Sequence, residues 1–307
     1  MPDAVPDPVT RAVQRTVMPP STGTSTGTST AAVPPASVLL VGGHESGAAS
    51  RLRPLVEDAI AVSAVGVGRD LAAAVSQALA GSDRPVCVLP MTLGRDPRLV
   101  ADAARTLRWL AGPAGQGRLA LCDPFGSPAH LVGWLRAAAG RALGTEAAES
   151  SGPAETIGAT GTDDAAVLVT APVAGPFEDA ELFRIARLVR QYRTHRWVEV
   201  AFEGGDPNLA EGVERCRRLG ARRIVLLPAG FGPAPTVPGA EDGGPLLSAR
   251  AVAGVLRARV AVALDRLRHG EDGIAAGLNA EHGHGFPHSH GPADGHAHPH
   301  AGTAHHH

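Results

Sequence analysis

The sequence predicts an α/β protein that contains two parallel sheets flanked by helices. From residue 38 to residue 268, short runs of apolar and β-branched residues alternate with longer segments of helical period. This alternation is typical of parallel strands that are joined by right-handed helical crossovers. The run at 85–90 is also similar to the run at 223–228, so we expect two related domains.

The first domain is expected over residues 38–143. Its first strand is an apolar run that ends on Gly42 and Gly43, which permit a tight turn before the next helix. The turn after each parallel strand lies at the carboxyl edge of the sheet, where open α/β proteins bind ligands. The expected strands are 38–43, 61–67, 85–91 and 118–123, and the expected helices that follow them are 47–58, 69–80, 97–111 and 128–143.

The second domain is expected over residues 164–269, after a linker of small and polar residues at 144–163. The segment 229–246 is rich in glycine and proline and shows no clear fourth strand, so this domain is expected to be shortened. Its expected strands are 165–171, 197–203 and 222–228, and its expected helices are 178–193, 207–219 and 247–268.

Both ends of the chain are expected to be disordered. Residues 1–37 contain scattered prolines and a Ser/Thr/Gly repeat, and such a segment cannot bury enough apolar area to offset its ordering entropy. Residues 270–307 form an expected tail in which histidine alternates with small residues.

The composition excludes several classes of function. All 28 basic residues are arginine, so the chain has no lysine for a phosphate-binding loop or for a Schiff base, and no nucleotide cofactor is expected. A net charge of −2 does not indicate a nucleic-acid partner, and no apolar run is long enough to predict a membrane span. The three cysteines are far apart and form no metal or redox motif, so a reduced, cytoplasmic location is expected.

His44 is the strongest candidate for a functional residue. It follows the first expected strand and its two glycines, which places it at the carboxyl edge of the sheet. An imidazole in this position can bind a metal ion or accept a proton near neutral pH. The alternative interpretation is a solvated turn histidine without a chemical role.

Three segments carry a resemblance to a known family. They are Val-Gly-Gly-His-Glu-Ser at 41–46, Pro-Met-Thr-Leu-Gly-Arg-Asp at 90–96, and the run 197–202 followed by 211–228. Over residues 38–268 the chain resembles the sirohydrochlorin cobaltochelatases, which are class II chelatases of the CbiX/SirB type. The resemblance implies two ferrochelatase-like (chelatase) domains. It also implies a lyase that inserts Co²⁺ into sirohydrochlorin, or a closely related tetrapyrrole, without ATP in cobalamin biosynthesis.

The resemblance also implies the residues of the site. The family carries a metal-binding histidine in the turn after the first strand, and His44 matches this position. A second histidine normally follows the third strand, but the loop 92–97 contains none. Glu45 and Asp96 are therefore the candidates to share the catalytic role with His44. The alternative for both acids is that they cap the helices that begin after them.

A tetrapyrrole of this class carries many carboxylates, so its site should present fixed positive charge. Arginine binds carboxylates with two hydrogen bonds and stays charged when it is partly removed from water. Five arginines lie near the expected strand ends or in the first turns of the expected helices, namely Arg51, Arg53, Arg69, Arg95 and Arg98. We expect Arg95 to bind the substrate because it lies in the loop itself, and Ser46 and Thr92 are the other predicted substrate-binding residues.

The tail gives a separate signal for metal binding. Ten of the 26 residues from 282 to 307 are histidine, and their irregular spacing predicts many weak, exchanging sites rather than one structural zinc site. Tethered to a chelatase, such a tail would raise the local concentration of the ions that it binds, which are Co²⁺, Ni²⁺, Zn²⁺ or Cu²⁺. The predicted tail ligands are His282, His284, His288, His290, His296, His298 and His300.

Two functions remain open from the sequence. The first is the chelatase, with a tetrapyrrole and a divalent metal ion as its partners. The second is a non-catalytic protein that stores or delivers cobalt or nickel on the same scaffold, and the absence of the second histidine favours it. The sequence leaves the oligomeric state open.

Overall fold

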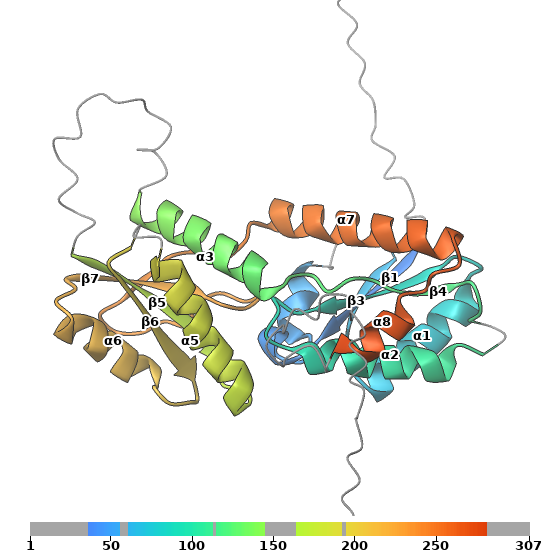
Figure 1. The fold of residues 1–307 in the computed structure, drawn as a ribbon, viewed down its shortest axis with the longest axis horizontal. Helices are drawn as coiled ribbons and strands as arrows, with labels where there is room; N and C mark the ends of the chain where they lie inside the picture. Colours follow the sequence, from blue (N-terminus) through green and yellow to red (C-terminus); the bar gives the residue numbers. More distant parts are fainter. Residues whose placement is uncertain (1–35, 56–60, 113–114, 145–163, 192–194, 281–307) are drawn as a thin grey trace, which may run out of the picture. The chain divides into compact units, whose positions relative to one another are not determined.

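Two parallel sheets organise the chain (Figure 1). The computed structural model describes residues 36–55, 61–112, 115–144, 164–191 and 195–280. The first sheet contains β1 (Ser37–Gly42), β2 (Val62–Gly66), β3 (Val86–Met91) and β4 (Leu119–Leu121), in the order β2-β1-β3-β4. The second contains β5 (Ala165–Pro172), β6 (Trp197–Glu203), β7 (Arg223–Pro228) and β8 (Glu241–Asp242), in the order β6-β5-β7-β8. All neighbouring strands are parallel, which confirms the predicted fold class.

The second sheet has a fourth strand that the sequence does not reveal. β8 contains two residues of the Gly/Pro-rich loop, and it lies parallel to β7. The backbone N–H of Gly243 continues this pairing by donating to the carbonyl of Leu226 at 2.9 Å. A strand of two residues is too short to show an apolar period, so the expectation of no fourth strand was wrong. The second sheet is nevertheless shortened, because its edge strand is so brief.

The helices follow the strands with one exception. The α-helices are α1 (Arg69–Gly81), α2 (Pro97–Leu110), α3 (Pro128–Leu143), α5 (Pro176–Gln191), α6 (Leu209–Arg218), α7 (Ala249–Arg268) and α8 (Ile274–Leu278). The helix expected at 47–58 is replaced by two 3₁₀ segments, η1 (His44–Ser46) and η2 (Ser50–Leu55), within the described residues. Ala48 and Ala49 between them have positive φ angles of 50° and 75°, and Pro54 lies inside η2, so an α-helix is interrupted here.

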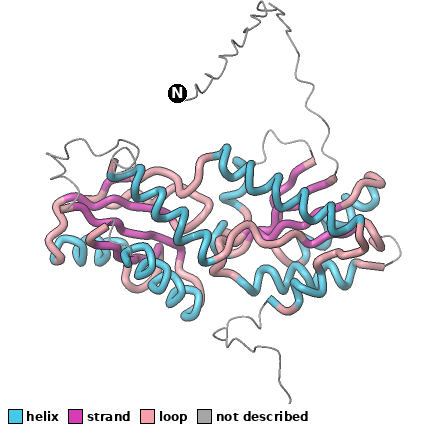
Figure 2. Tube along the Cα trace, turned by 45° about the horizontal axis from the view of Figure 1, so that its top comes forward, coloured by secondary structure: helices cyan, strands magenta, loops and turns pink. Residues whose placement is uncertain are grey.

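Two helices pack on the sheet of the opposite half. α3 follows β4 in the chain but contacts α5 and β7, whereas α7 follows the second sheet and contacts β3 and β4 of the first (Figures 1 and 2). Arg223 of β7 donates a hydrogen bond to the carbonyl of Ala142 in α3 at 3.2 Å, and Arg266 of α7 pairs with Asp123 at 2.7 Å. One continuous apolar core accordingly includes residues of both sheets. The predicted boundaries at 38–143 and 164–269 remain predictions, but neither range buries its sheet without a helix from the other.

The predicted terminal segments lie largely outside the described residues. This holds for 1–35 of the N-terminal segment, for 145–163 of the linker and for 281–307 of the tail. Residues 270–280, which were expected to begin the disordered tail, instead form a turn and helix α8. Ile274 is 5% exposed and packs with Leu99, Leu107 and Leu121 on the outer face of the first sheet. The apolar side of this helix is only one turn long, so its helical period was not visible in the sequence.

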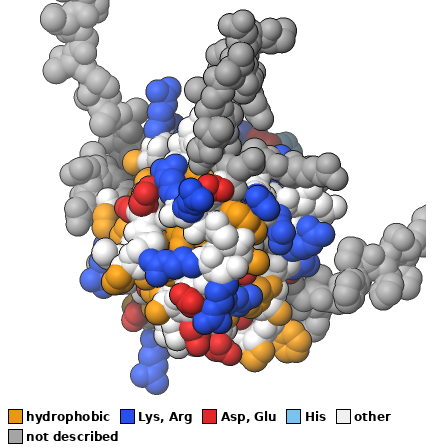
Figure 3. Space-filling model, turned by 90° about the vertical axis from the view of Figure 1, so that its left-hand side faces the viewer, with side chains coloured by type: hydrophobic (Ala, Val, Ile, Leu, Met, Phe, Trp, Pro, Cys, Tyr) orange, Lys and Arg blue, Asp and Glu red, His pale blue; other side chains and the backbone are white. Residues whose placement is uncertain are grey.

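Surface charge is mixed on the face that Figure 3 shows, where basic and acidic side chains lie close together. Arg218 pairs with Glu214 at 3.0 Å on α6, and Arg215 pairs with Glu199 at 3.3 Å. Such exposed pairs stabilise a fold by less than about 1 kcal/mol each. These charges therefore form a solvated surface. Among the described residues, no helix is long and apolar enough to cross a membrane.

The packing of α8 leads to the first prediction. Replacing Ile274 by Ala should lower the free energy of unfolding by about 2 to 5 kcal/mol, because a buried side chain leaves a cavity against Leu121. The matched control is Ala275→Ser on the exposed side of the same helix, which should leave the stability nearly unchanged. Urea denaturation followed by circular dichroism measures both. Equal stability of the two variants would show that α8 does not hold its place on the sheet.

Candidate functional site

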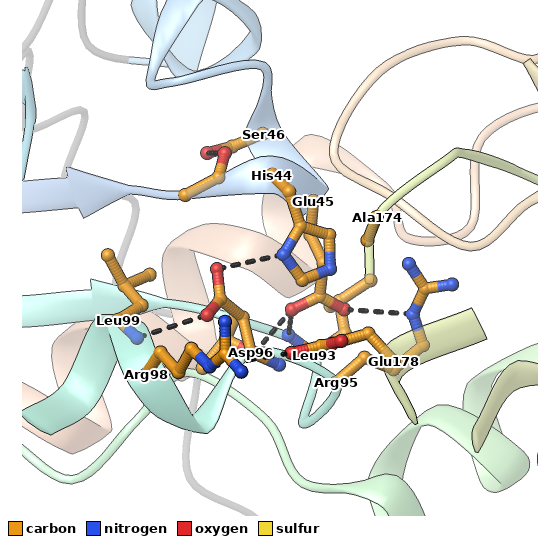
Figure 4. A network of polar contacts seen from close by, with 12 residues as sticks. His44, Glu45, Ser46, Leu93, Arg95, Asp96, Arg98, Leu99, Ala174 and Glu178 are labelled. Carbon is orange, nitrogen blue, oxygen red and sulfur yellow. Dashed lines mark hydrogen bonds and ion pairs between the residues drawn. The ribbon is translucent and has the colours of Figure 1, made fainter. Parts of the chain in front are cut away.

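The candidate site is built from two turns at the carboxyl edge of the first sheet. β1 and β3 are neighbours in register, with Gly42 opposite Met91. The turn that follows β1 is η1, and the turn that follows β3 contains residues 92–96 and leads into α2. Because the strands are parallel and adjacent, the two turns lie side by side, and the polar residues of both meet there (Figure 4).

His44 and Asp96 form the contact that joins the two turns. Nδ1 of His44 lies 3.0 Å from Oδ2 of Asp96, and the side chains are 21% and 11% exposed. A Cβ atom at residue 43 would collide with this carboxylate, so only glycine leaves room for the contact. The structure therefore brings together the two residues that the sequence singled out in separate turns.

Asp96 has two roles at once. Its Oδ1 accepts a hydrogen bond from the backbone N–H of Leu99 at 3.0 Å and so caps α2, with Pro97 at the first helical position. Its Oδ2 faces His44. Burial alone would raise the pKa of Asp96, but the hydrogen bond and charge of His44, together with the backbone donors, hold this pKa below its ordinary value. The predicted helix cap and the predicted site residue are thus the same carboxylate.

An ionised Asp96 determines which nitrogen of His44 carries the proton. A carboxylate only accepts hydrogen bonds, so in the neutral imidazole Nδ1 donates and Nε2 keeps its lone pair. Within the described residues Nε2 is buried and has no hydrogen-bond partner. A histidine held by a carboxylate at one nitrogen and unpaired at the other has the geometry of a metal ligand or of a proton acceptor.

Glu45 lies behind this pair and is completely buried. Its Oε2 accepts hydrogen bonds from the backbone N–H of Leu93 at 2.9 Å and from the hydroxyl of Thr92. Its Oε1 faces Arg95, whose Nε is 3.7 Å away. Burial raises the pKa of Glu45, although Arg95 and the two hydrogen bonds act against this shift. Glu45 is closed off from solvent in this structure, and its predicted catalytic role stays a prediction.

The three predicted substrate-binding residues are also buried. Arg95 is 1% exposed and faces Glu45, because the loop folds inward and needs a cation beside that acid. Thr92 is 2% exposed and donates to Glu45, while its oxygen accepts the backbone N–H groups of Gly94 and Asp96. Ser46 is fully buried and donates to the carbonyl of Gly43 at 3.1 Å. In this structure each of the three side chains holds the shape of the two turns, and their contact with a substrate stays a prediction.

The second half of the chain contributes contacts that the sequence did not reveal. The backbone N–H of Phe231 donates to the carbonyl of Glu45 at 3.3 Å. Glu203, at the end of β6, pairs with Arg51 at 3.0 Å, and Glu178, in the first turn of α5, lies 4.0 Å from Arg98. Arg51 and Arg98 were among the arginines noted at strand ends, but nothing in the sequence indicated their partners. Contacts of this kind depend on the packing of distant segments.

The described residues do not provide a complete metal site. Among them no group of three or more His, Cys, Asp or Glu side chains lies close enough together to hold an ion. His44 and Asp96 are therefore a pair rather than a cluster. The predicted tail ligands His282, His284, His288, His290, His296, His298 and His300 lie outside the described residues.

Comparisons with known proteins find similarity over part of the chain. Residues 176–234, from α5 to the loop after β7, match the CbiX family model. The sirohydrochlorin cobaltochelatase of Priestia megaterium is 38% identical over 71 residues, which are 22% of this chain and 23% of that protein. The match thus spans about a quarter of the length of this relative.

Two solved structures resemble the fold over a longer stretch. The sirohydrochlorin chelatase SirB from Bacillus subtilis subspecies spizizenii, in complex with cobalt, is 12% identical with a TM-score of 0.44. That similarity covers 76% of this chain and 97% of the SirB chain. SirB from Bacillus subtilis with Fe³⁺ is 13% identical with a TM-score of 0.47, and the coverage is 76% and 98%.

The buried acid leads to the second prediction. Between the ordinary pKa of 4.5 and its raised value, Glu45 holds a proton in the folded chain that it releases in the unfolded chain. The free energy of unfolding therefore falls as the pH rises through this range. Glu45→Gln cannot ionise, so its stability should depend less on pH than that of the unmodified chain, as measured by urea denaturation at a series of pH values from 4.5 upward.

The control for this experiment is Glu214→Gln, which changes a half-exposed acid on α6. This variant should leave the dependence of the free energy of unfolding on pH unaltered. If the free energy of unfolding changes equally with pH in Glu45→Gln and in the unmodified chain, a raised pKa at Glu45 is contradicted.

Proposed function

We propose that this chain, a member of the CbiX/SirB-type chelatase family, inserts a divalent metal ion into a tetrapyrrole of the sirohydrochlorin class. Co²⁺ is the preferred ion of the proposal, and Ni²⁺ and Fe²⁺ are the alternatives, because all three accept imidazole ligands. The reaction needs no ATP, and the metal ion is a substrate rather than a resident cofactor.

The single observation that carries this proposal is the unpaired Nε2 of His44. Asp96 fixes the ring through Nδ1, so the lone pair of Nε2 has one direction and is available to an incoming group. This nitrogen is shielded from solvent in the structure, so the ring or its neighbours must move to admit an ion. An unpaired buried nitrogen is also costly to the fold, which favours a ligand at this position.

His44 can serve both steps of an insertion. In its neutral form it binds a divalent ion through Nε2. After the ion has moved to the ring nitrogens, the same lone pair can accept one of the two pyrrole protons, and the second proton passes to solvent. The negative charge of Asp96 stabilises the imidazolium that forms. Glu45, Thr92 and Arg95 keep the two turns in place through their contacts with one another.

The family assignment adds the substrate class. The relative in Priestia megaterium is named as a sirohydrochlorin cobaltochelatase, and we extend this activity to the present chain as part of the proposal. The rival proposal is a protein that stores or delivers cobalt or nickel without catalysis. The absence of a second histidine from the loop 92–97 favours this rival.

The decisive experiment follows the rate of insertion. Purified chain, sirohydrochlorin and Co²⁺ are mixed under anaerobic conditions, and the change in the tetrapyrrole absorption spectrum is compared with the spontaneous reaction. The proposal expects a clear acceleration near neutral pH. A rate equal to the spontaneous one at every pH between 6 and 9, with metal still bound, would leave the storage or delivery protein as the function.

The third prediction concerns the site pair. His44→Ala should reduce the accelerated rate by roughly 100-fold or more, because it removes the metal ligand and proton acceptor. Asp96→Asn keeps the shape but loses the charge, and it should reduce the rate by about 10- to 100-fold. The matched control is His130→Ala, which removes an exposed imidazole outside the site and should leave the rate unchanged. Full activity of His44→Ala would place the chemistry at another residue.

The fourth prediction concerns metal supply by the tail. We propose that the distal histidines His296, His298 and His300 bind metal weakly and raise its local concentration. Replacing the three by Ala should slow insertion only when Co²⁺ is limiting, and the rate at saturating Co²⁺ should stay the same. Rate measurements over a series of buffered Co²⁺ concentrations test this. An equal loss at all concentrations would contradict a supply role.

A further inference from the structure

Each of the two turns of the site is followed by an arginine that pairs with a glutamate of the second half of the chain. Arg51 lies in η2, and its Nη2 donates to Oε2 of Glu203, at the end of β6, at 3.0 Å. Arg98 lies in the first turn of α2, and its Nε is 4.0 Å from Oε1 of Glu178 in the first turn of α5 (Figure 4). The candidate site therefore carries one such ion pair beside each of its two turns.

The side chain of Arg51 is held in place along its stem. Gly232, in the loop after β7, packs against it, because a Cβ atom there would lie 2.7 Å from Cδ of Arg51. A Cβ atom at Gly230 would lie 3.8 Å from Nη1 of Arg51 and 3.1 Å from the carbonyl oxygen of Glu45. The guanidinium thus lies close to the turn that carries His44, and the side chain of Arg51 is still 26% exposed. Arg51 is consequently a fixed cation at the edge of the site.

Neither ion pair is closed to solvent. Glu203 is 28% exposed, and Arg98 is 66% exposed. Ion pairs that solvent reaches add little to stability, so one carboxylate can replace another at the same guanidinium at little cost. The position of Glu203 also shows where a carboxylate fits beside Arg51, within hydrogen-bonding distance of Nη2. A carboxylate of a ligand can therefore occupy the place that each glutamate takes here.

We propose that Arg51 and Arg98 bind two carboxylates of the tetrapyrrole, and that Glu203 and Glu178 hold these two positions as exchangeable placeholders until the substrate arrives. On binding, each guanidinium changes its carboxylate partner and the released glutamate turns to solvent, so the number of ion pairs stays the same. This inference rests on the proposed function for the identity of the substrate. It adds to that function the residues that select a ligand by its carboxylates.

Binding of metal-free sirohydrochlorin tests the exchange without insertion. The full-length chain is compared with Arg51→Gln, with Glu203→Gln and with the double variant that combines both changes. A second set of the same kind is made for Arg98 and Glu178. The dissociation constant of each variant is measured by titration of the tetrapyrrole fluorescence, with no Co²⁺ present.

The arginines and the glutamates should have opposite effects on the affinity. Arg51→Gln should weaken binding by roughly tenfold or more, because a charge-assisted contact to the ligand is lost. Glu203→Gln should tighten binding by about two- to fivefold, because the guanidinium no longer has a competing carboxylate. In the Arg51→Gln background, Glu203→Gln should change the affinity by less than about twofold, since a placeholder acts only through its arginine. The same signs are expected for Arg98 and Glu178.

The double variant separates the exchange from two simpler roles. If Glu203→Gln weakens binding, the glutamate positions its arginine for the ligand, and the placeholder is rejected. If Glu203→Gln tightens binding equally with and without Arg51, the glutamate only repels an anionic ligand, and the exchange is again rejected. A gain in affinity cannot come from a damaged fold, so the glutamate variants remain informative even if Arg51→Gln lowers the stability.

The matched control is an exposed ion pair away from the site. Arg218 and Glu214 pair at 3.0 Å on α6, and Arg218→Gln and Glu214→Gln should each change the affinity by less than about twofold. Effects as large as those at Arg51 and Glu203 would show that net charge alone decides binding, which would overturn the proposal.

The insertion assay distinguishes a failure of this inference from a failure of the proposed function. If the binding data show the exchange but the chain does not accelerate insertion, the two carboxylate positions stand and the chelatase is rejected. If the chain accelerates insertion but the double variant shows no coupling between Arg51 and Glu203, the chelatase stands and the exchange is rejected.

Discussion

The candidate site depends on one hydrogen bond, between Nδ1 of His44 and the carboxylate of Asp96. This contact joins the turns after two neighbouring parallel strands, and it needs a glycine at residue 43 to form at all. The carboxylate is itself held by its cap on α2. The ring of His44 is consequently oriented by the helix as well as by the strand, and its second nitrogen is the one polar group of the pair that remains without a partner in the described part of the chain.

The buried acid beneath the pair explains how two short turns keep a fixed shape. Glu45 accepts hydrogen bonds from Leu93 and Thr92, and Arg95 compensates part of its charge. A carboxylate without solvent is costly, so this arrangement persists only because its partners are supplied by the neighbouring turn. The carbonyl of Glu45 also accepts a hydrogen bond from Phe231, so the same turn is tied to the second half of the chain. Rigid support behind a small reactive pair is what precise positioning requires.

The sequence predicted the parts of this arrangement that are local. Strand β1, its glycine turn and His44 follow from an apolar run and two glycines, and Asp96 before Pro97 is a helix cap that can be read directly. The roles of Glu45 and Arg95 were not predictable, because a charged residue in a loop is normally exposed and only the folded turns bury it. Helices α3 and α7 each pack on the sheet of the other half of the chain. The spacing of apolar residues predicts that a helix forms, but it does not indicate which sheet the helix packs against. β8 and α8 are each too short for any period to show.

A site with few protein ligands suits an ion that must be released. A closed cluster of three or four side chains holds a metal ion structurally, whereas insertion into a macrocycle needs open positions and ligands that leave in turn. His44 and Asp96 together provide one oriented nitrogen and one supporting charge, which is too little to retain an ion against a tetrapyrrole. In the proposed function, such a pair can bind an ion weakly and give it up to the macrocycle.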